Sequence, residues 1–170
     1  MRKVIFLAVL GILAGCSAKP STVISYSDAF NLSLPTSTLS EATFFSADGL
    51  SVGWSDQKLI SGLIVTRELE SLPSNFDLKD YPRYLLKLKD TSGLSPEVAE
   101  IFNNSANEFD YSFGLENVTE RTTDSLKIYS ACREDRCTAF VLKEGVNDHI
   151  LSMYTQKISE QEFNDLLEGF

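Results

Sequence analysis

Two segments near the end of the chain, residues 126–132 and 137–142, carry apolar side chains on both sides of a strand pattern. The charged run Arg133-Glu134-Asp135-Arg136 separates them and suits a turn. A hairpin that places Cys132 opposite Cys137 pairs Ser130 with Ala139 and Ile128 with Val141 on one face, and Tyr129 with Phe140 and Lys127 with Leu142 on the other. Because strands that are largely apolar on both sides need cover on both sides, the sequence predicts an α+β fold: an antiparallel sheet of about five to seven strands with helices packed on both faces.

Four further segments are predicted to be strands or extended chain. Residues 30–34 alternate apolar and polar side chains and stop at a proline, as a half-buried strand does. Residues 59–66 and 150–155 are rich in strand-forming residues. Residues 109–113 alternate aromatic and polar side chains, which is typical of a strand with an aromatic face.

Asp48-Gly49 predicts a tight hairpin with a definite register. Folding around these two residues pairs Phe45 with Val52 and Thr43 with Trp54. This placement gathers most of the apolar side chains on one face, which favours it over neighbouring registers. Trp54 is then expected to belong to the core.

Three helices are predicted from their first residues. Asp80 precedes a segment with a proline in its first turn, and Ser95-Pro96-Glu97 combines a cap, a proline and an acid. Ser159-Glu160-Gln161-Glu162 has the capping-box pattern. The apolar residues behind it recur at helical spacing and predict a C-terminal amphipathic helix; they are Phe163, Leu166, Leu167 and Phe170.

The N-terminus has the three parts of a secretion signal. Arg2 and Lys3 are positive, an apolar run covers residues 4–14, and Leu13-Ala14-Gly15-Cys16 closes it. A helix rises about 1.5 Å per residue, so the run reaches roughly half of the ~30 Å hydrocarbon core of a membrane. It is therefore too short for a stable span and is interpreted as a signal peptide.

Leu13-Ala14-Gly15-Cys16 resembles the lipobox of bacterial lipoproteins at every position. The resemblance implies cleavage before Cys16, a diacylglycerol on its sulfur, and membrane attachment through that lipid. The expected organisation is a signal peptide (1–15), a lipidated tether (16–27) and a single α+β domain (28–170). Ser17 resembles an outer-membrane sorting signal, so we expect the periplasmic face of the outer membrane, with the inner membrane as the alternative because Lys19 follows closely.

The order of the predicted elements is similar to the PsbP-like α/β/α sandwich. The similarity lies in the opening strand that ends at Leu34-Pro35, the hairpins after it, and the closing strand and helix of residues 150–170. It implies a binding or assembly role rather than chemistry. Fold similarity alone does not assign a function.

The chain is acidic. Its formal charge is −9, and removal of residues 1–15 takes away Arg2 and Lys3 and lowers the charge to −11. This balance argues against nucleic acid as a partner and is compatible with a cationic one.

Cys132 and Cys137 are predicted to form a disulfide. If Cys16 carries lipid, they are an even pair in a compartment where disulfides persist. The alternatives are a zinc site or a redox pair. Zinc needs four ligands, for which one histidine and no third free cysteine remain, and redox pairs usually have two residues between the cysteines. No metal site and no cofactor are expected.

Arg133, Glu134, Asp135 and Arg136 form the tip of the clamped hairpin. They are either a solvated turn or a rigid loop that binds a partner. His149, the one histidine, follows Asp148, but no G-x-S-x-G element marks a nucleophile, and no catalytic residue is predicted.

The expected function is that of a non-enzymatic accessory or binding subunit of the cell envelope, attached to the membrane through Cys16 and bound to an envelope protein. One alternative is an inhibitor or immunity protein against a cationic enzyme or toxin, which the acidic charge would favour. The other is an envelope hydrolase that uses His149.

Overall fold

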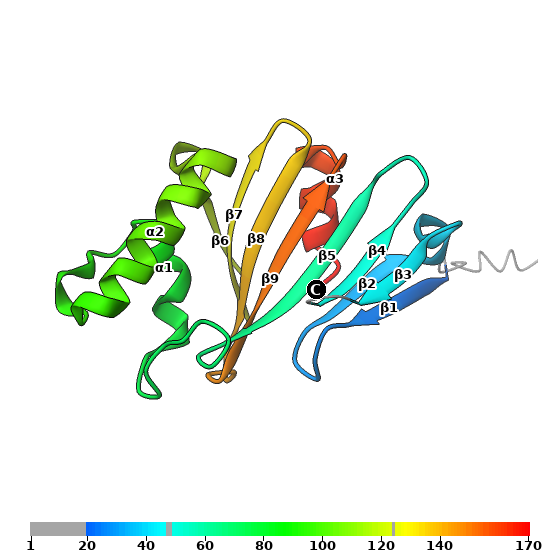
Figure 1. The fold of residues 1–170 in the computed structure, drawn as a ribbon. Helices are drawn as coiled ribbons and strands as arrows, with labels where there is room; N and C mark the ends of the chain where they lie inside the picture. The colour runs from blue at the N-terminus through cyan, green and yellow to red at the C-terminus, as the bar shows by residue number, and fades with distance from the viewer. Residues whose placement is uncertain (1–19, 47–48, 124) are drawn as a thin grey trace, which may run out of the picture.

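The computed structural model describes residues 20–46, 49–123 and 125–170, and these residues form an α+β domain around a seven-stranded antiparallel sheet (Figure 1). The predicted signal peptide, the lipobox and Cys16 lie outside the described residues. In spatial order the strands are β3 (Thr43–Ser46), β4 (Leu50–Gly53), β5 (Leu59–Thr66), β9 (His149–Gln156), β8 (Arg136–Lys143), β7 (Leu126–Arg133) and β6 (Thr119–Thr122). The predicted fold class is confirmed.

The sheet consists of two meanders that meet in its middle. Strands β3, β4 and β5 follow one another, as do β6, β7, β8 and β9, and β9 pairs with β5 over the full length of both. The connection from β5 to β6 contains α1 (Tyr81–Leu85), α2 (Pro96–Phe113) and three short 3-10 turns: η2 (Leu78–Asp80), η3 (Thr91–Gly93) and η4 (Leu115–Asn117). This connection carries α1 and α2 across one face of the sheet. A further 3-10 turn, η1 (Thr36–Leu39), lies between β2 and β3.

Each face of the sheet is covered by a separate layer, as predicted. On the face that we call the α2 face, Tyr84 and Phe102 from the helices pack with Tyr129, Phe140 and Ile150 of the sheet. The opposite face, the α3 face, is covered by α3 (Glu160–Leu167) and by a two-stranded sheet of β1 (Ser21–Ser25) and β2 (Asn31–Pro35). Figure 1 shows α1 and α2 at one end of the molecule and β1 to β4 at the other.

The cysteine hairpin has the predicted register. Strand β7 pairs with β8 so that Cys132 lies opposite Cys137, and Tyr129 lies opposite Phe140. Residues 137–142 are buried without interruption, because β8 lies near the middle of the sheet between both layers.

The predicted strand at residues 109–113 is wrong, because these residues form the last turns of α2. Ser95 caps the helix by accepting a hydrogen bond from the backbone N–H of Val98. The buried residues recur at helical spacing from there on and are Val98, Phe102, Ala106 and Phe109. A buried stripe over about three turns outweighs an alternation that covers only five residues, and Tyr111 is left 86% exposed.

The register predicted around Asp48-Gly49 is wrong by one residue. Phe44, and not Phe45, lies opposite Val52, and Phe45 lies opposite Ser51. Every residue of β3 is exposed, so burial does not select one register of this edge strand over its neighbour. Gly49 also approaches β5 closely, since a Cβ there would lie 2.3 Å from the carbonyl oxygen of Gly62.

Part of the expected tether belongs to the folded domain. Residues 21–25 form β1, which pairs with β2 along its whole length. Ile24 is 3% exposed, and the ring of Tyr26 lies on the backbone of Gly62 in β5. The β1–β2 hairpin is therefore fixed to the main sheet by its own side chains.

Replacing Gly62 with alanine tests this packing. An added Cβ would lie 2.2 Å from the Tyr26 ring, so we expect G62A to destabilise the domain by about 1–3 kcal/mol in urea unfolding, as overpacked sites do. Gly93, which has open space around it, is the matched control, and G93A should change stability little. Equal stabilities of G62A and G93A would contradict the described hairpin packing.

Candidate functional site

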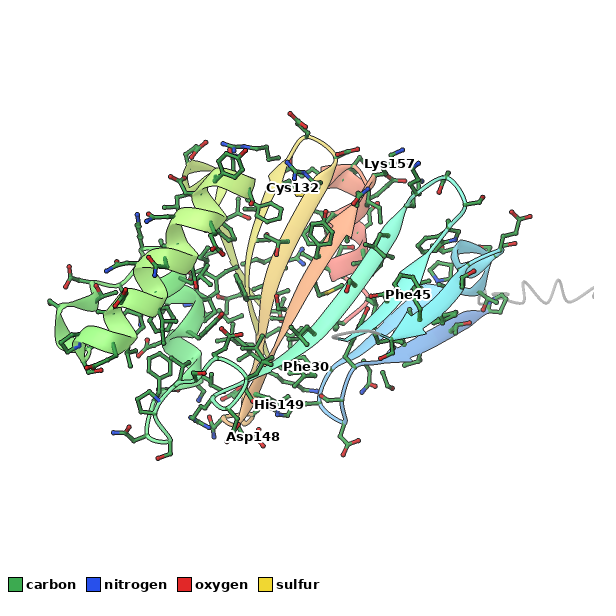
Figure 2. All side chains as sticks on the ribbon, in the orientation of Figure 1. Phe30, Phe45, Cys132, Asp148, His149 and Lys157 are labelled. Atoms are coloured by element: carbon green, nitrogen blue, oxygen red, sulfur yellow. A yellow bond between two sulfur atoms is a disulfide. The ribbon has the colours of Figure 1, made fainter. Side chains whose placement is uncertain are left out.

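A chain of hydrogen-bonded polar side chains joins the small sheet to the main sheet at one end of β9. The Nε2 atom of His149 lies 3.1 Å from the Oγ atom of Ser27, and its Nδ1 atom lies 2.7 Å from the Oδ1 atom of Asp148. His149 is the first residue of β9, and Ser27 lies in the turn between β1 and β2. Figure 2 shows Asp148, His149 and Phe30 together at this end of the sheet.

The turn that carries Ser27 is held by its own hydrogen bonds. The Ser27 Oγ atom accepts hydrogen bonds from the backbone N–H groups of Ala29 and Phe30, at 3.2 and 3.3 Å. The Phe30 ring meets the His149 ring edge to face, with 5.6 Å between the ring centroids. These contacts hold the side chains of Ser27 and His149 in place. The Ser27–His149 hydrogen bond is therefore part of the packing between the small sheet and the main sheet.

The side chains of Ser27, Asp148 and His149 line a cleft of about 370 Å³. Its other walls come from the end of β5 and the residues after it; they are Ile64, Thr66, Arg67 and Glu68. Arg67 donates to the backbone carbonyl groups of Phe76 and Asn147, at 2.6 and 2.8 Å. It therefore shapes the cleft wall and holds the loop before Asp148.

The charge of Asp148 depends on its neighbour. The hydrogen bond from His149 lowers the pKa of the Asp148 carboxyl group below its usual value of 3.8, although the carboxyl group is open to solvent. When Nδ1 of His149 carries the proton and donates to Asp148, Nε2 is left as an acceptor for the Ser27 hydroxyl. This arrangement of nucleophile, base and orienting carboxylate is the one that serine hydrolases use.

Two larger cavities lack a comparable hydrogen-bonded chain of hydroxyl, imidazole and carboxylate groups. One, of about 560 Å³, lies between β2, Trp54 and α3, and the Lys58–Glu162 ion pair at 3.5 Å is part of its wall. The other, of about 430 Å³, lies beside α1, with the buried ring of Tyr129 among its lining residues.

Cys132 and Cys137 form the predicted disulfide, with their Cα atoms 4.1 Å apart. The four charged residues of the hairpin tip, expected to be a solvated turn or a partner-binding loop, do not all lie in the turn. Arg133 and Arg136 pair at the ends of β7 and β8, and only Glu134 and Asp135 form the exposed turn. Arg133 donates to the backbone carbonyl of Tyr111 at 2.7 Å, so it holds the end of α2 against the hairpin.

The disulfide hairpin and the cleft lie at opposite ends of the sheet. Arg136 is opposite Gln156, and His149 is at the other end of the same strand, about 23 Å away at the usual rise of a strand. Figure 2 shows Cys132 far from His149. The structure therefore places the predicted site residues of the hairpin far from the Asp148–His149 pair.

Ser27 was missed by the sequence reasoning. It is 122 positions from His149 in the chain, and it stands in no recognised nucleophile motif. The only sign of this site in the sequence was the neighbouring pair Asp148-His149.

Within residues 20–46, 49–123 and 125–170, no three His, Cys, Asp or Glu side chains are grouped to hold a metal ion. In that same part of the chain, no helix has the length and apolar character needed to cross a bilayer. Comparison of the whole chain with family models, curated proteins and solved structures finds no match.

The lowered pKa of Asp148 predicts a pH-dependent contribution to stability. The folded state favours the carboxylate, so this contribution is complete above the usual pKa of 3.8 and is lost as the pH falls through the lower folded pKa. We expect D148N to be less stable than the unmodified chain at pH 6, with a gap that closes in strong acid, as measured by urea unfolding at several pH values.

Asp28 provides a control with the same change of charge. It is exposed in the turn beside Ser27, and the hydrogen-bond partner of the His149 Nδ1 atom is Asp148 and not Asp28. The D28N variant should not reproduce the pH-dependent gap. If D28N and D148N behave alike, the His149–Asp148 hydrogen bond does not contribute to stability as described.

Proposed function

We propose that this chain is a lipid-anchored lipoprotein of the bacterial cell envelope that faces the periplasm and acts by binding an envelope protein. The observation that carries the proposal is the lipobox Leu13-Ala14-Gly15-Cys16 at the end of a short apolar segment. The outer membrane is the proposed site because Ser17 follows the anchor residue.

The disulfide supports an extracytoplasmic location. Cys132 and Cys137 are bonded at the end of the central hairpin, and such bonds persist in oxidising compartments and are rare in the cytosol. The formal charge of −11 that remains after removal of residues 1–15 supports solubility in the periplasm.

Exposed apolar side chains support a binding role. Phe44, Phe45 and Leu88 are each about half exposed, and the described surface also presents Tyr111 at 86% exposure. Exposed aromatic groups are a common component of interaction surfaces. They lie on several elements, so they do not single out one partner.

A second candidate function, hydrolysis of an ester or amide, is favoured by the Ser27–His149–Asp148 chain. In this reaction the Ser27 Oγ atom would form a bond to the substrate carbonyl carbon, and its proton would pass to Nε2 of His149 and then to the leaving group. Water would cleave the resulting acyl-serine and restore the hydroxyl. A small acyl group fits the scale of the 370 Å³ cleft.

The lipid on Cys16 can be tested by the intact mass of the protein purified from membranes. We expect a chain that begins at Cys16 and carries the mass of a diacylglycerol and of an acyl group on the new N-terminus. The C16S variant should keep residues 1–15 and lack the lipid. A purified chain that keeps Met1, or an unmodified Cys16, would exclude the proposal.

Hydrolysis can be tested with chromogenic esters of short acyl groups and with envelope material in zymograms. If the chain is a hydrolase, S27A and H149A should each lower the rate by at least about 100-fold, as loss of a nucleophile or base does. D28N changes an exposed residue of the same turn and should keep the rate. A rate that is the same in all three variants and the unmodified chain would exclude Ser27 and His149 as the catalytic pair.

A further inference from the structure

Strand β3 is an exposed aromatic edge of the main sheet. It pairs with β4 on one side and has no strand partner in the described chain on the other. Phe44 is 50% exposed and Phe45 is 47% exposed, and as neighbours in a strand they lie on opposite faces of this edge. Figure 2 shows Phe45 on the β3–β4 side of the molecule, far from α2.

The start of the described chain lies at this same end. The backbone N–H of Thr36 donates to the carbonyl oxygen of Pro20 at 2.9 Å, so Pro20 is fixed beside η1. Strand β3 begins a few residues after η1 ends. In Figure 1 the first strand, η1 and β3 all lie at the end of the molecule opposite α1 and α2.

The distance from Pro20 to Cys16, the proposed anchor residue, is short. Cys16 is four residues before Pro20, and four residues span at most roughly 14 Å of extended chain. A lipid on Cys16 therefore keeps the β1, η1 and β3 end of the domain near the bilayer surface.

The segment that forms β1, β2, η1 and β3 is poor in charge in an otherwise acidic chain, while Asp56 and Lys58 follow β4 at the same end. Only Asp28 and Glu41 are charged among residues 20–46, whereas charged residues make up 23% of the whole chain. The rest of the domain carries most of the negative charge, which anionic lipids repel. A charge-poor segment with exposed aromatic rings suits the membrane interface, where aromatic side chains are enriched.

We infer that β3 lies against the bilayer that holds Cys16, with Phe44 and Phe45 in the interfacial region and with α1 and α2 directed away from the membrane. This inference rests on the proposed lipid anchor. It identifies the lipid surface as the occupant of the exposed β3 edge, and it leaves the opposite end of the domain free for a protein partner.

The placement can be measured with single-tryptophan variants of the full lipidated chain. The chain has one tryptophan, Trp54, so W54F provides the background for two aromatic replacements, F45W and Y111W. Tyr111 is the matched control because it is exposed near the end of α2, beside the β7–β8 hairpin and away from β3. The variants are placed in vesicles of phosphatidylethanolamine and phosphatidylglycerol with brominated acyl chains, which quench fluorescence on contact.

We expect the brominated lipid to quench F45W at least about twofold more strongly than Y111W, because an interfacial ring lies close to the acyl chains. Intact mass measured on the same samples reports the lipid on Cys16. With the lipid present, equal quenching of the two variants would overturn the placement but leave the proposed anchor. A blue-shifted F45W emission without quenching would identify a protein contact instead and also overturn it. Absence of the lipid would overturn both proposals.

Discussion

The burial of β8 on both of its faces is the constraint on which the rest of the molecule depends. Residues 137–142 are all buried, with Cys137, Ala139 and Val141 on the α3 face and Phe140 and Leu142 on the α2 face. A strand of this kind is stable only between two layers, because exposure of either face would return its apolar area to water. The domain therefore needs both the α1–α2 connection and the α3 layer.

Elements with a local signal could be predicted from the sequence, and elements set by distant contacts could not. The cysteine hairpin was predicted with its register, because Cys132 and Cys137 align a pattern that is apolar on both sides. The capping box at Ser159 was also predicted, because its two hydrogen bonds join residues of one turn. At β3 the predicted register was wrong because the strand is exposed on both faces, so burial does not favour one register over the next.

The candidate site illustrates the same limit. Asp148 and His149 are neighbours in the chain, but Ser27 reaches His149 only because the β1–β2 hairpin packs on the main sheet. The packing that brings them together includes a contact between the Tyr26 ring and Gly62, and neither residue carries a local signal for it. Long-range packing thus creates the one site in the described chain where a hydroxyl, an imidazole and a carboxylate are joined by hydrogen bonds.

Hydrogen exchange of the backbone amides tests the two-sided burial of the central strand most directly. Amides of β8 should exchange slowest and only through global unfolding, with a free energy of opening equal to the free energy of unfolding in urea. Amides at the open β3 edge should exchange fastest among the strands of the lipid-free domain. Exchange of residues 137–142 through a smaller opening, at a rate similar to that of β3, would contradict a sheet held between two layers.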